Sequence, residues 1–235
     1  MKKKILFFED LGKKGYQETW DYQKILFNKL IQKKINKDKN QITGYLLFVE
    51  HPHVYTIGKN GKYQHLLVSS DFLKKIEATF YLTDRGGDIT YHGPGQLVVY
   101  PILNMDDLFT DIHKYIRFLE EVIIHFLKYY GIKGGRQTGK TGVWLGEKKR
   151  ISYKKICSIG IRMSRWVTMH GFALNVNTDL RYFDYIIPCG LINKEMTSLK
   201  EELNHPISFY EVKYLVKKSF KKIFNVECIY PNYSL

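Results

Sequence analysis

The sequence predicts an α+β protein in which a mixed β-sheet is flanked by helices. Helix-like patterns lie near the start, in the middle and near the end of the chain, and strand-like segments cluster between them. The segments do not alternate one strand with one helix, which would favour a doubly wound parallel sheet. A chain of 235 residues buries roughly 70–75% of its unfolded surface. It needs no disulfide or metal to support a core.

The first half of the chain supplies one helix and several strands. The segment 16–34 places apolar side chains on or near one stripe, which predicts an amphipathic helix. The segment 44–58, with the sequence GYLLFVEHPHVYTIG, reads as strand and ends at Gly58. The segment 78–103 reads as a strand, a glycine-rich loop and a second strand.

The clearest helix follows at 111–130, where apolar residues keep a 3, 4, 3 spacing. Gly131 stands directly after it, at the position where glycine commonly ends a helix. The segments 141–162 and 166–176 then return to strands joined by turns.

A capping-box pattern of Ser208 and Glu211 opens a last helix, which we expect to reach about Lys222. No shift in composition marks a domain boundary. We therefore predict a single domain over residues 1–235, in which residues about 200–235 form a C-terminal helical extension.

Cysteine usage and the chain start favour a cytoplasmic protein. The three cysteines, Cys157, Cys189 and Cys228, are odd in number and widely spaced, which is a poor disulfide framework. Free thiols are typical of a reducing compartment. The apolar run that begins at Ile5 stops at Phe8, too short for the apolar core of a signal peptide. No window approaches the ~18 apolar residues of a membrane helix.

The formal net charge is +14. This excess favours an acidic partner, such as nucleic acid, anionic lipid or an acidic protein. The lysines can also be solvated helix faces, and composition alone does not choose between these interpretations.

The segment 85–96, with the sequence RGGDITYHGPGQ, is the densest candidate for a binding loop. Glycines let the backbone approach a ligand closely, and Arg85, Thr90 and His92 supply polar groups among them. The pattern is neither a dinucleotide-binding fingerprint nor a phosphate-binding loop. A glycine-rich hairpin connection is the alternative.

Two strand segments carry further candidates. If 154–162 is a strand, Lys155, Cys157 and Ile159 share one face, so Lys155 can point inward beside Cys157. We interpret Cys157 as structural. His170 can be a buried structural histidine, and the backbone that follows it, 171–173, can line a narrow apolar slot.

Cys189 lies between Pro188 and Gly190. Proline fixes its own φ and lacks an N–H, and glycine permits a sharp reversal, so the cysteine is displayed on a corner. A buried, inert thiol is the alternative for an isolated cysteine.

Taken together, these segments resemble the lipoyl(octanoyl) transferases, the LipB family of octanoyl-[acyl-carrier-protein]:protein N-octanoyltransferases. The matching stretches are LGKKGYQETWDYQ, EHPHVYTIG, RGGDITYHGPGQLVVYP, TGVWLGEKKRISYKKICSIGIR, VTMHGFALNVNTDL and FDYIIPCGL. They run in the family's order over about residues 10–200. The resemblance implies the mixed-sheet fold shared by biotin and lipoate protein ligases.

The resemblance also implies the site. Its nucleophile would be Cys189 and its essential lysine Lys155, where the short stretch RISY leaves Lys154 as an alternative. Neither a metal nor a cofactor is implied. The implied substrate-binding residues are Arg85, Gly86, Gly87, Asp88, Ile89, Thr90, Tyr91, His92, Ser158, Ile159, Gly160, Gly171, Phe172 and Ala173.

The implied reaction moves an octanoyl or lipoyl group from acyl carrier protein to a lysine of a lipoyl domain, through a cysteine thioester. The implied acceptors are the lipoyl domains of 2-oxoacid dehydrogenases and the glycine cleavage H protein. We expect a monomer that binds neither nucleic acid nor membrane. Two alternatives stay open: an ATP-dependent lipoate–protein ligase on the same fold, and a basic nucleic-acid-binding module.

Overall fold

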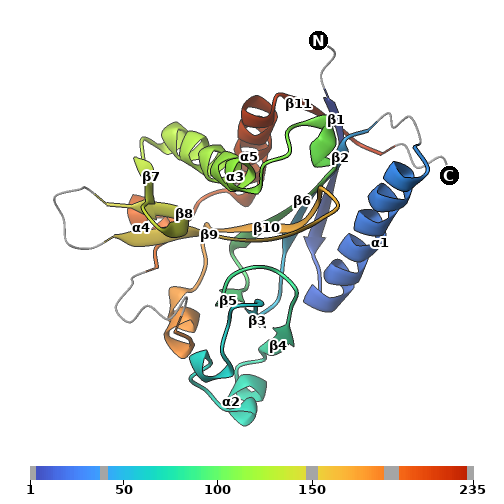
Figure 1. The fold of residues 1–235 in the computed structure, drawn as a ribbon. Helices are drawn as coiled ribbons and strands as arrows, with labels where there is room; N and C mark the ends of the chain where they lie inside the picture. Colours follow the sequence, from blue (N-terminus) through green and yellow to red (C-terminus); the bar gives the residue numbers. More distant parts are fainter. Residues whose placement is uncertain (1–3, 38–41, 147–152, 188–195, 232–235) are drawn as a thin grey trace.

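The structure is a computed structural model and describes residues 4–37, 42–146, 153–187 and 196–231. Its strands and helices alternate irregularly along the chain, as Figure 1 shows. In chain order they are β1 (Lys4–Lys13), α1 (Tyr16–Ile35), β2 (Gly44–Glu50), β3 (Val54–Ile57), α2 (Ser70–Lys75), β4 (Thr79–Leu82), β5 (Ile89–His92), β6 (Gln96–Leu103), α3 (Ile112–Leu127), β7 (Gly134–Gln137), β8 (Lys140–Leu145), β9 (Lys154–Ser164), β10 (Val167–Asn175), α4 (Leu199–Leu203), α5 (Phe209–Phe224) and β11 (Val226–Ile229).

Most strands form one mixed sheet. Its order is β11-β1-β2-β6-β10-β9-β8-β7. The pairs β11–β1 and β1–β2 are parallel, and the pairs from β2–β6 to β8–β7 are antiparallel. A second, smaller sheet has the order β4-β3-β5 and lies below the main sheet in Figure 1. The predicted fold class, a mixed sheet flanked by helices, is confirmed.

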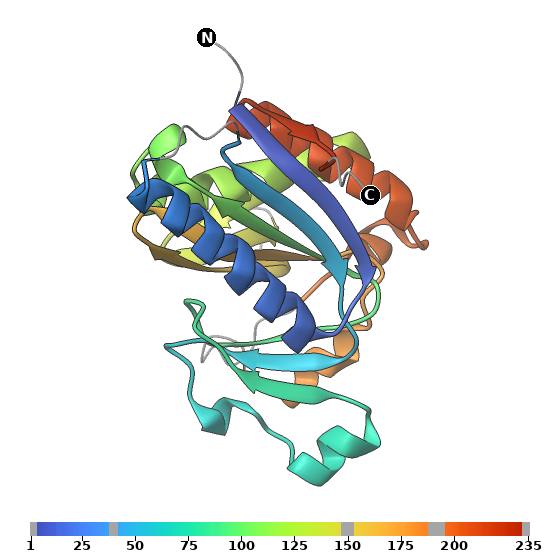
Figure 2. The same ribbon diagram turned by 90° about the vertical axis from the view of Figure 1, so that its right-hand side faces the viewer.

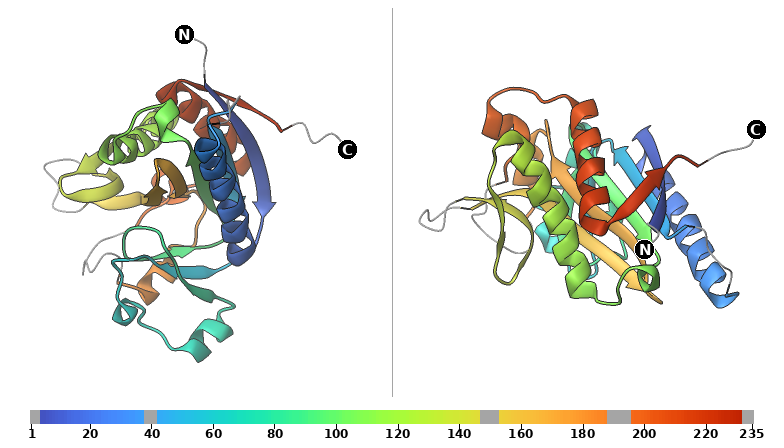
Figure 3. Two further views of the ribbon diagram at one scale, coloured as in Figure 1. Left: turned by 45° about the vertical axis from the view of Figure 1, so that its right-hand side comes forward. Right: turned by 90° about the horizontal axis from the view of Figure 1, so that it is seen from above.

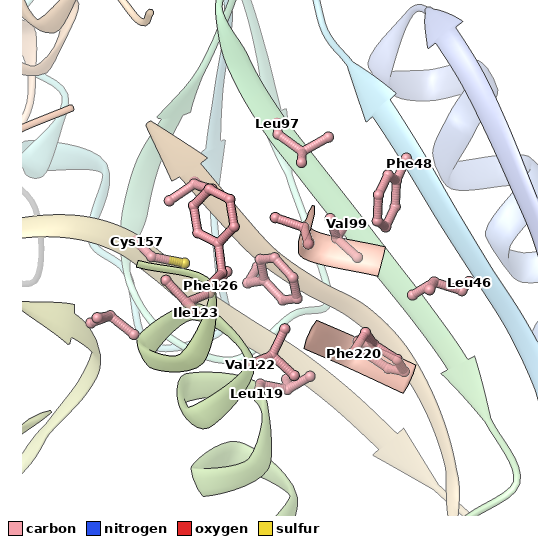
Figure 4. Packing of buried hydrophobic residues seen from close by; sticks show 14 of the residues in the cluster. Leu46, Phe48, Leu97, Val99, Leu119, Val122, Ile123, Phe126, Cys157 and Phe220 are labelled. Carbon is pink, nitrogen blue, oxygen red and sulfur yellow. The ribbon is translucent and has the colours of Figure 1, made fainter. Parts of the chain in front are cut away.

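Helices cover the main sheet on both faces. Helices α3 and α5 lie side by side over one face, and α1 crosses the other face against β6 and β10 (Figures 2 and 3). The larger core cluster fills the space under α3 and α5, where Phe126 and Phe220 are fully buried (Figure 4). The face under α1 has its own apolar cluster, which includes Phe27 and Leu30. The small sheet lies on the side of the main sheet that is opposite α3 and α5 (Figure 1).

Side-chain caps and a glycine set the ends of the predicted helices. The Asp111 side chain accepts from the Lys114 backbone N–H at 3.0 Å and caps α3. Gly131 adopts the left-handed conformation after that helix, with φ of 68°, which glycine tolerates best. The Ser208 hydroxyl accepts from the Glu211 N–H and caps α5. The helices predicted at 16–34, 111–130 and from Ser208 are confirmed.

Two predictions about strands are wrong in detail. The segment 44–58 is two strands in different sheets, because β2 ends at Glu50 and β3 begins at Val54. Pro52 lies between them and has no N–H to give to a sheet ladder. The segment 85–96 is not wholly loop, because β5 occupies Ile89–His92 and pairs antiparallel with β3.

The C-terminal residues join the main sheet and the larger core. Helix α5 packs against α3, and β11 pairs in parallel with the edge strand β1. The predicted helical extension did not include this strand. Within the described ranges, every helix is too short or too polar to cross a membrane.

Candidate active site

A cavity of about 450 Å³ opens between the main sheet and the small sheet. Strands β6, β9 and β10 supply one wall, and the segment 85–92 supplies the facing wall. Lys155 and all the predicted substrate-binding residues except Tyr91 line it. The Tyr91 ring instead stacks on Tyr182 in the small sheet's core, and its hydroxyl lies 2.7 Å from His53 Nδ1.

The part of the first wall where β9 and β10 pair, called the cavity floor below, contains four small residues. In the antiparallel pair β9–β10, Ser158 faces Ala173 and Gly160 faces Gly171. All four line the cavity. A Cβ added at Gly171 would lie 2.1 Å from the Val99 carbonyl oxygen, so neighbouring backbone excludes any side chain there. This floor has room for a slender apolar chain.

The glycine-rich wall is held by Arg85. Its guanidinium is buried and donates to the Thr56 carbonyl at 2.5 Å and to the Gly86 carbonyl at 3.0 Å. The Gly86 N–H donates to Ile161 O at 2.8 Å and ties this wall to β9. A Cβ at Gly160 would come within 2.9 Å of Gly86 O. Arg85 thus fastens the wall to β3, and glycine lets the two walls approach.

Asp84 and His170 join the two walls beside the cavity. His170 Nε2 lies 2.7 Å from Asp84 Oδ1, and Arg162 pairs with the other carboxylate oxygen. Burial opposes ionisation of Asp84, but the bond from His170 and the charge of Arg162 outweigh it and lower its pKa to about 2. Burial lowers the pKa of His170, so the imidazole is neutral and donates its Nε2–H.

His170 is also a backbone exception. Its φ is +60°, a conformation that residues other than glycine rarely adopt, and its N–H donates to Gln23 Oε1 at 3.0 Å. The strained residue directly precedes Gly171 and turns the chain into the cavity floor. His170 was predicted as a structural histidine, and these contacts give it the role of fixing the floor.

Lys155 lies in a mostly buried position beside this cavity, with 9% of its surface exposed. Its Nζ lies 5.0 Å from the centre of the Trp144 ring. A cation over an aromatic face is favourable, more so when it is removed from water. The fold thus holds the amine of Lys155 in a mostly buried position, whereas most lysines extend their amine to solvent.

Lys155 and Cys157 do not share a face as expected from strand alternation. Trp144 pairs with Lys155 and Val143 with Cys157, so Ile156 is an extra residue that shifts the register. Ile156 and Cys157 both belong to the core under α3, whereas Lys155 lines the cavity. Burial raises the pKa of the Cys157 thiol well above its ordinary value, which suits a structural cysteine.

Cys189, the predicted nucleophile, lies outside the described residues. The described residues on either side of that segment make backbone hydrogen bonds, and those that follow it bond to Lys155. Ile187 N donates to His65 O at 2.8 Å, and Thr197 N donates to Lys155 O at 3.0 Å. Met196 forms a parallel bridge with Lys155 and lines the cavity.

A series of hydrogen bonds connects the glycine-rich wall to the Lys155 backbone. His92 Nδ1 lies 2.8 Å from Gln96 Oε1, and Gln96 Nε2 donates to Asn175 Oδ1 at 2.9 Å. Asn175 Nδ2 donates to Thr197 O at 2.9 Å, and Thr197 in turn bonds Lys155. Burial lowers the pKa of His92 to about 3, so its imidazole stays neutral.

Sequence reasoning missed several residues that line the cavity, notably Tyr16, Val98, Tyr100 and Trp144. Both tyrosines are buried, and the Tyr100 hydroxyl lies 2.9 Å from His51 Nε2. Their sequence patterns indicate only a helix and a strand. Among the described residues, no group of three or more His, Cys, Asp or Glu side chains could hold a metal ion.

Comparison with known proteins identifies the family. Residues 15–221 match the lipoyl protein ligase A/B catalytic domain. The chain is 54% identical to an octanoyltransferase of Christiangramia forsetii over 94% of this chain and 96% of that protein. It is 52% identical to an octanoyltransferase of Flavobacterium psychrophilum, over 96% and 99% of the two chains.

Solved structures show the same fold. A lipoate protein ligase of Thermoplasma acidophilum with bound lipoic acid superposes with a TM-score of 0.68 at 19% identity, over 98% of this chain and 89% of that one. A lipoate-protein ligase A bound with ATP gives 0.70 at 17% identity, with the same coverage. The chain belongs to the lipoyl protein ligase A/B catalytic-domain family and, within it, to the octanoyltransferases.

Proposed function

We propose that this protein transfers an octanoyl group from acyl carrier protein to a lysine of a lipoyl domain, with Cys189 as nucleophile and Lys155 as its activating partner. The observation that most strongly supports this proposal is the placement of Lys155. Its mostly buried side chain lines a cavity with a floor of small residues, and Met196, which follows the segment of Cys189, bridges to it. The family's octanoyltransferase members support the same reaction.

The first half-reaction is acyl transfer to sulfur. The Cys189 thiolate attacks the thioester carbonyl of the octanoyl carrier, a new C–S bond forms, and the bond to the carrier's sulfur breaks. The carrier leaves as a thiolate that takes the proton of the Lys155 ammonium, so Lys155 becomes a neutral amine. An octanoyl thioester remains on the enzyme, as in other covalent, two-step catalysis.

The second half-reaction forms an amide. The acceptor lysine attacks the enzyme thioester as a neutral amine, loses its proton, and releases the Cys189 thiolate. Lys155, which the first half-reaction leaves as a neutral amine, receives that proton and is again an ammonium beside the released thiolate; desolvation makes the neutral form accessible between the two steps. The thioester is already activated, so no ATP is consumed.

Lys155 supplies the charge that activates the thiol. A free cysteine has a pKa of about 8.5, and the thiolate is the reactive form. An ammonium about 4 Å away contributes up to about 4 kcal/mol at an effective dielectric of about 20. That corresponds to roughly three pKa units before desolvation offsets part of it.

The cavity floor suits the acyl chain. Burying about six methylenes contributes up to about 5 kcal/mol at roughly 0.8 kcal/mol each. The paired small residues Ser158–Ala173 and Gly160–Gly171 leave the backbone as the contact surface for that chain.

Charge supports the proposed partners. Acyl carrier proteins and many lipoyl domains are acidic, and this chain carries a net charge of +14. Lys140 lines the cavity on the β7–β8 hairpin, where an approaching carrier would meet it. We expect carrier binding to weaken as salt rises from about 50 to about 500 mM, since exposed charges are screened over shorter distances. Binding that is independent of salt would remove this explanation.

We also propose that the chain acts as one domain and as a monomer in the cytoplasm. The C-terminal helix α5 and strand β11 complete the core and the sheet that carry the site. The widely spaced cysteines fit a reducing compartment.

The test compares two reactions on one lipoyl-domain acceptor. With octanoyl-carrier protein and no nucleotide, we expect the acceptor to gain one octanoyl group by mass. With free lipoate and ATP, we expect no modification. The reverse pattern would establish an ATP-dependent lipoate ligase. Tight binding to oligonucleotides, with neither modification, would establish the nucleic-acid-binding alternative.

A further inference from the structure

A buried carboxylate, Glu120, lies behind Lys155 but outside the cavity. Its side chain is fully buried on α3. Glu120 Oε2 accepts from Arg117 Nη1 at 2.6 Å and from Arg136 Nε at 2.9 Å. Glu120 Oε1 accepts from the backbone N–H of Gly142 at 3.1 Å. One carboxylate therefore fastens both β7, through Arg136, and β8, through Gly142, to α3.

Gly142 is the neighbour of the lysine side chain. Its φ of +118° is a conformation that favours glycine. A Cβ there would lie 2.6 Å from Lys155 Cε and 2.6 Å from the Cys157 carbonyl oxygen. Real Cβ contacts this short do not occur, so the lysine and the β9 backbone would both have to move. Because Gly142 has no side chain, the end of the Lys155 side chain can occupy the space beside it.

The register shift lies at the same place. The β8–β9 register shifts between Val143 and Trp144, one residue after Gly142, and this shift separates Lys155 from the core face. The Gly142 N–H donates to Glu120 Oε1 at 3.1 Å. The bond to Glu120 therefore holds β8 to α3 beside the point where its pairing with β9 is irregular.

We propose that Glu120 is a positioning residue for Lys155. It holds Gly142 against α3 by accepting its N–H, and Gly142 in turn keeps the channel in which the Lys155 side chain lies. This inference rests on the proposed role of Lys155 as the partner of the Cys189 thiol. Glu120 touches neither the cavity nor the substrate, and it acts only through the position of the lysine.

The experiment measures the pH dependence of Cys189 alkylation by iodoacetamide, read as the mass of the Cys189 peptide. Glu120→Ala removes the acceptor of the Gly142 N–H, and Glu120→Gln keeps a carbonyl oxygen in its place. Both variants lose the ion pairs with Arg117 and Arg136. The melting temperature should therefore fall in both variants. The pKa of the Cys189 thiol should rise by about one unit or more only in Glu120→Ala.

At any pH below both pKa values, a one-unit rise makes alkylation about tenfold slower. Octanoylation of the thiol in a single turnover should slow by about 10–100-fold in Glu120→Ala, the range expected when a reacting group moves by about 1 Å. Gly142→Ala should shift the pH profile in the same direction, provided that it folds.

Glu121→Ala is the matched control. Glu121 is the next residue on α3 and pairs with Arg136 Nη2 at 2.7 Å, but it makes no bond to Gly142. Its profile should match the wild type. An unchanged thiol pKa in Glu120→Ala overturns the proposal. An equal shift in Glu120→Gln overturns it also, because the charge and not the Gly142 bond would then be the cause. If Lys155→Met leaves the thiol pKa unchanged, the proposed role of Lys155 fails first.

Discussion

Replacing Asp84 by asparagine should destabilise the protein through the link between the two cavity walls. The carboxylate accepts from His170 Nε2 at 2.7 Å and pairs with Arg162, and 27% of its side chain is exposed. Its pKa falls from 3.8 to about 2 in the folded protein. At 1.36 kcal/mol per pKa unit, this shift corresponds to about 2.4 kcal/mol. Partial exposure reduces the expected loss to about 2 kcal/mol.

The stability change depends on pH in a defined direction. Because the folded-state pKa of Asp84 is depressed, its contribution is complete above the unfolded value near 4 and is lost as the pH falls toward 2. For a chain of this length, about 2 kcal/mol at pH 7 lowers the melting temperature by roughly 4–8 °C. The difference from wild type should shrink as the pH is lowered from 7 to 3.

Calorimetry or circular dichroism over this pH range measures the effect. The control is Asp71→Asn, which removes an exposed pair with Lys74, and such pairs contribute about 0–1 kcal/mol. Asp84 directly precedes Arg85, and His170 directly precedes Gly171, so the KM for the octanoyl donor should also rise in Asp84→Asn. A melting temperature within 1 °C of wild type at pH 7, or a difference that grows on acidification, would refute this reasoning.

Three further substitutions test other parts of the account. Phe220→Ala, in the core between α5 and the sheet, should cost about 3–5 kcal/mol in urea unfolding; a loss under 1 kcal/mol would contradict the packing. Ala173→Val narrows the cavity floor. It should shift the ratio of kcat/KM for hexanoyl over octanoyl donors by about tenfold or more, since one methylene is worth 10–200-fold. An unchanged ratio would mean that the acyl chain does not lie against Ala173. Lys155→Met should fold, slow octanoylation at pH 7 by at least about tenfold and regain rate near pH 10, where the thiol ionises unaided; a parallel loss at all pH values would argue against thiol activation.

Local signals in the sequence predicted the helices well. The caps at Asp111 and Ser208 and the glycine at 131 act within one turn of the helix that they bound, so a short window contains the cause. The glycine-rich segment and residues 171–173 were also predicted as binding segments from their residues, and 158–160 from the family resemblance; the structure places all three around one cavity.

Features fixed by distant contacts could not be predicted from local pattern. Strand alternation placed Lys155 with Cys157, but the extra residue at Ile156 depends on how β9 pairs with β8. That pairing is interrupted beside Gly142, whose N–H is taken by Glu120, a residue 22 positions earlier on a different element. Tyr16 and Tyr100 line the same cavity as residues 85–90 of the facing wall, a juxtaposition of distant segments that periodicity does not reveal.

The central claim, that the acyl group passes through the Cys189 sulfur, is tested most directly by intact mass after mixing the protein with octanoyl-carrier protein alone. We predict the gain of one octanoyl group that hydroxylamine removes, present in Cys157→Ser and absent in Cys189→Ala. A Cys189→Ala protein that still delivers octanoyl groups to a lipoyl domain at the wild-type rate would contradict the account.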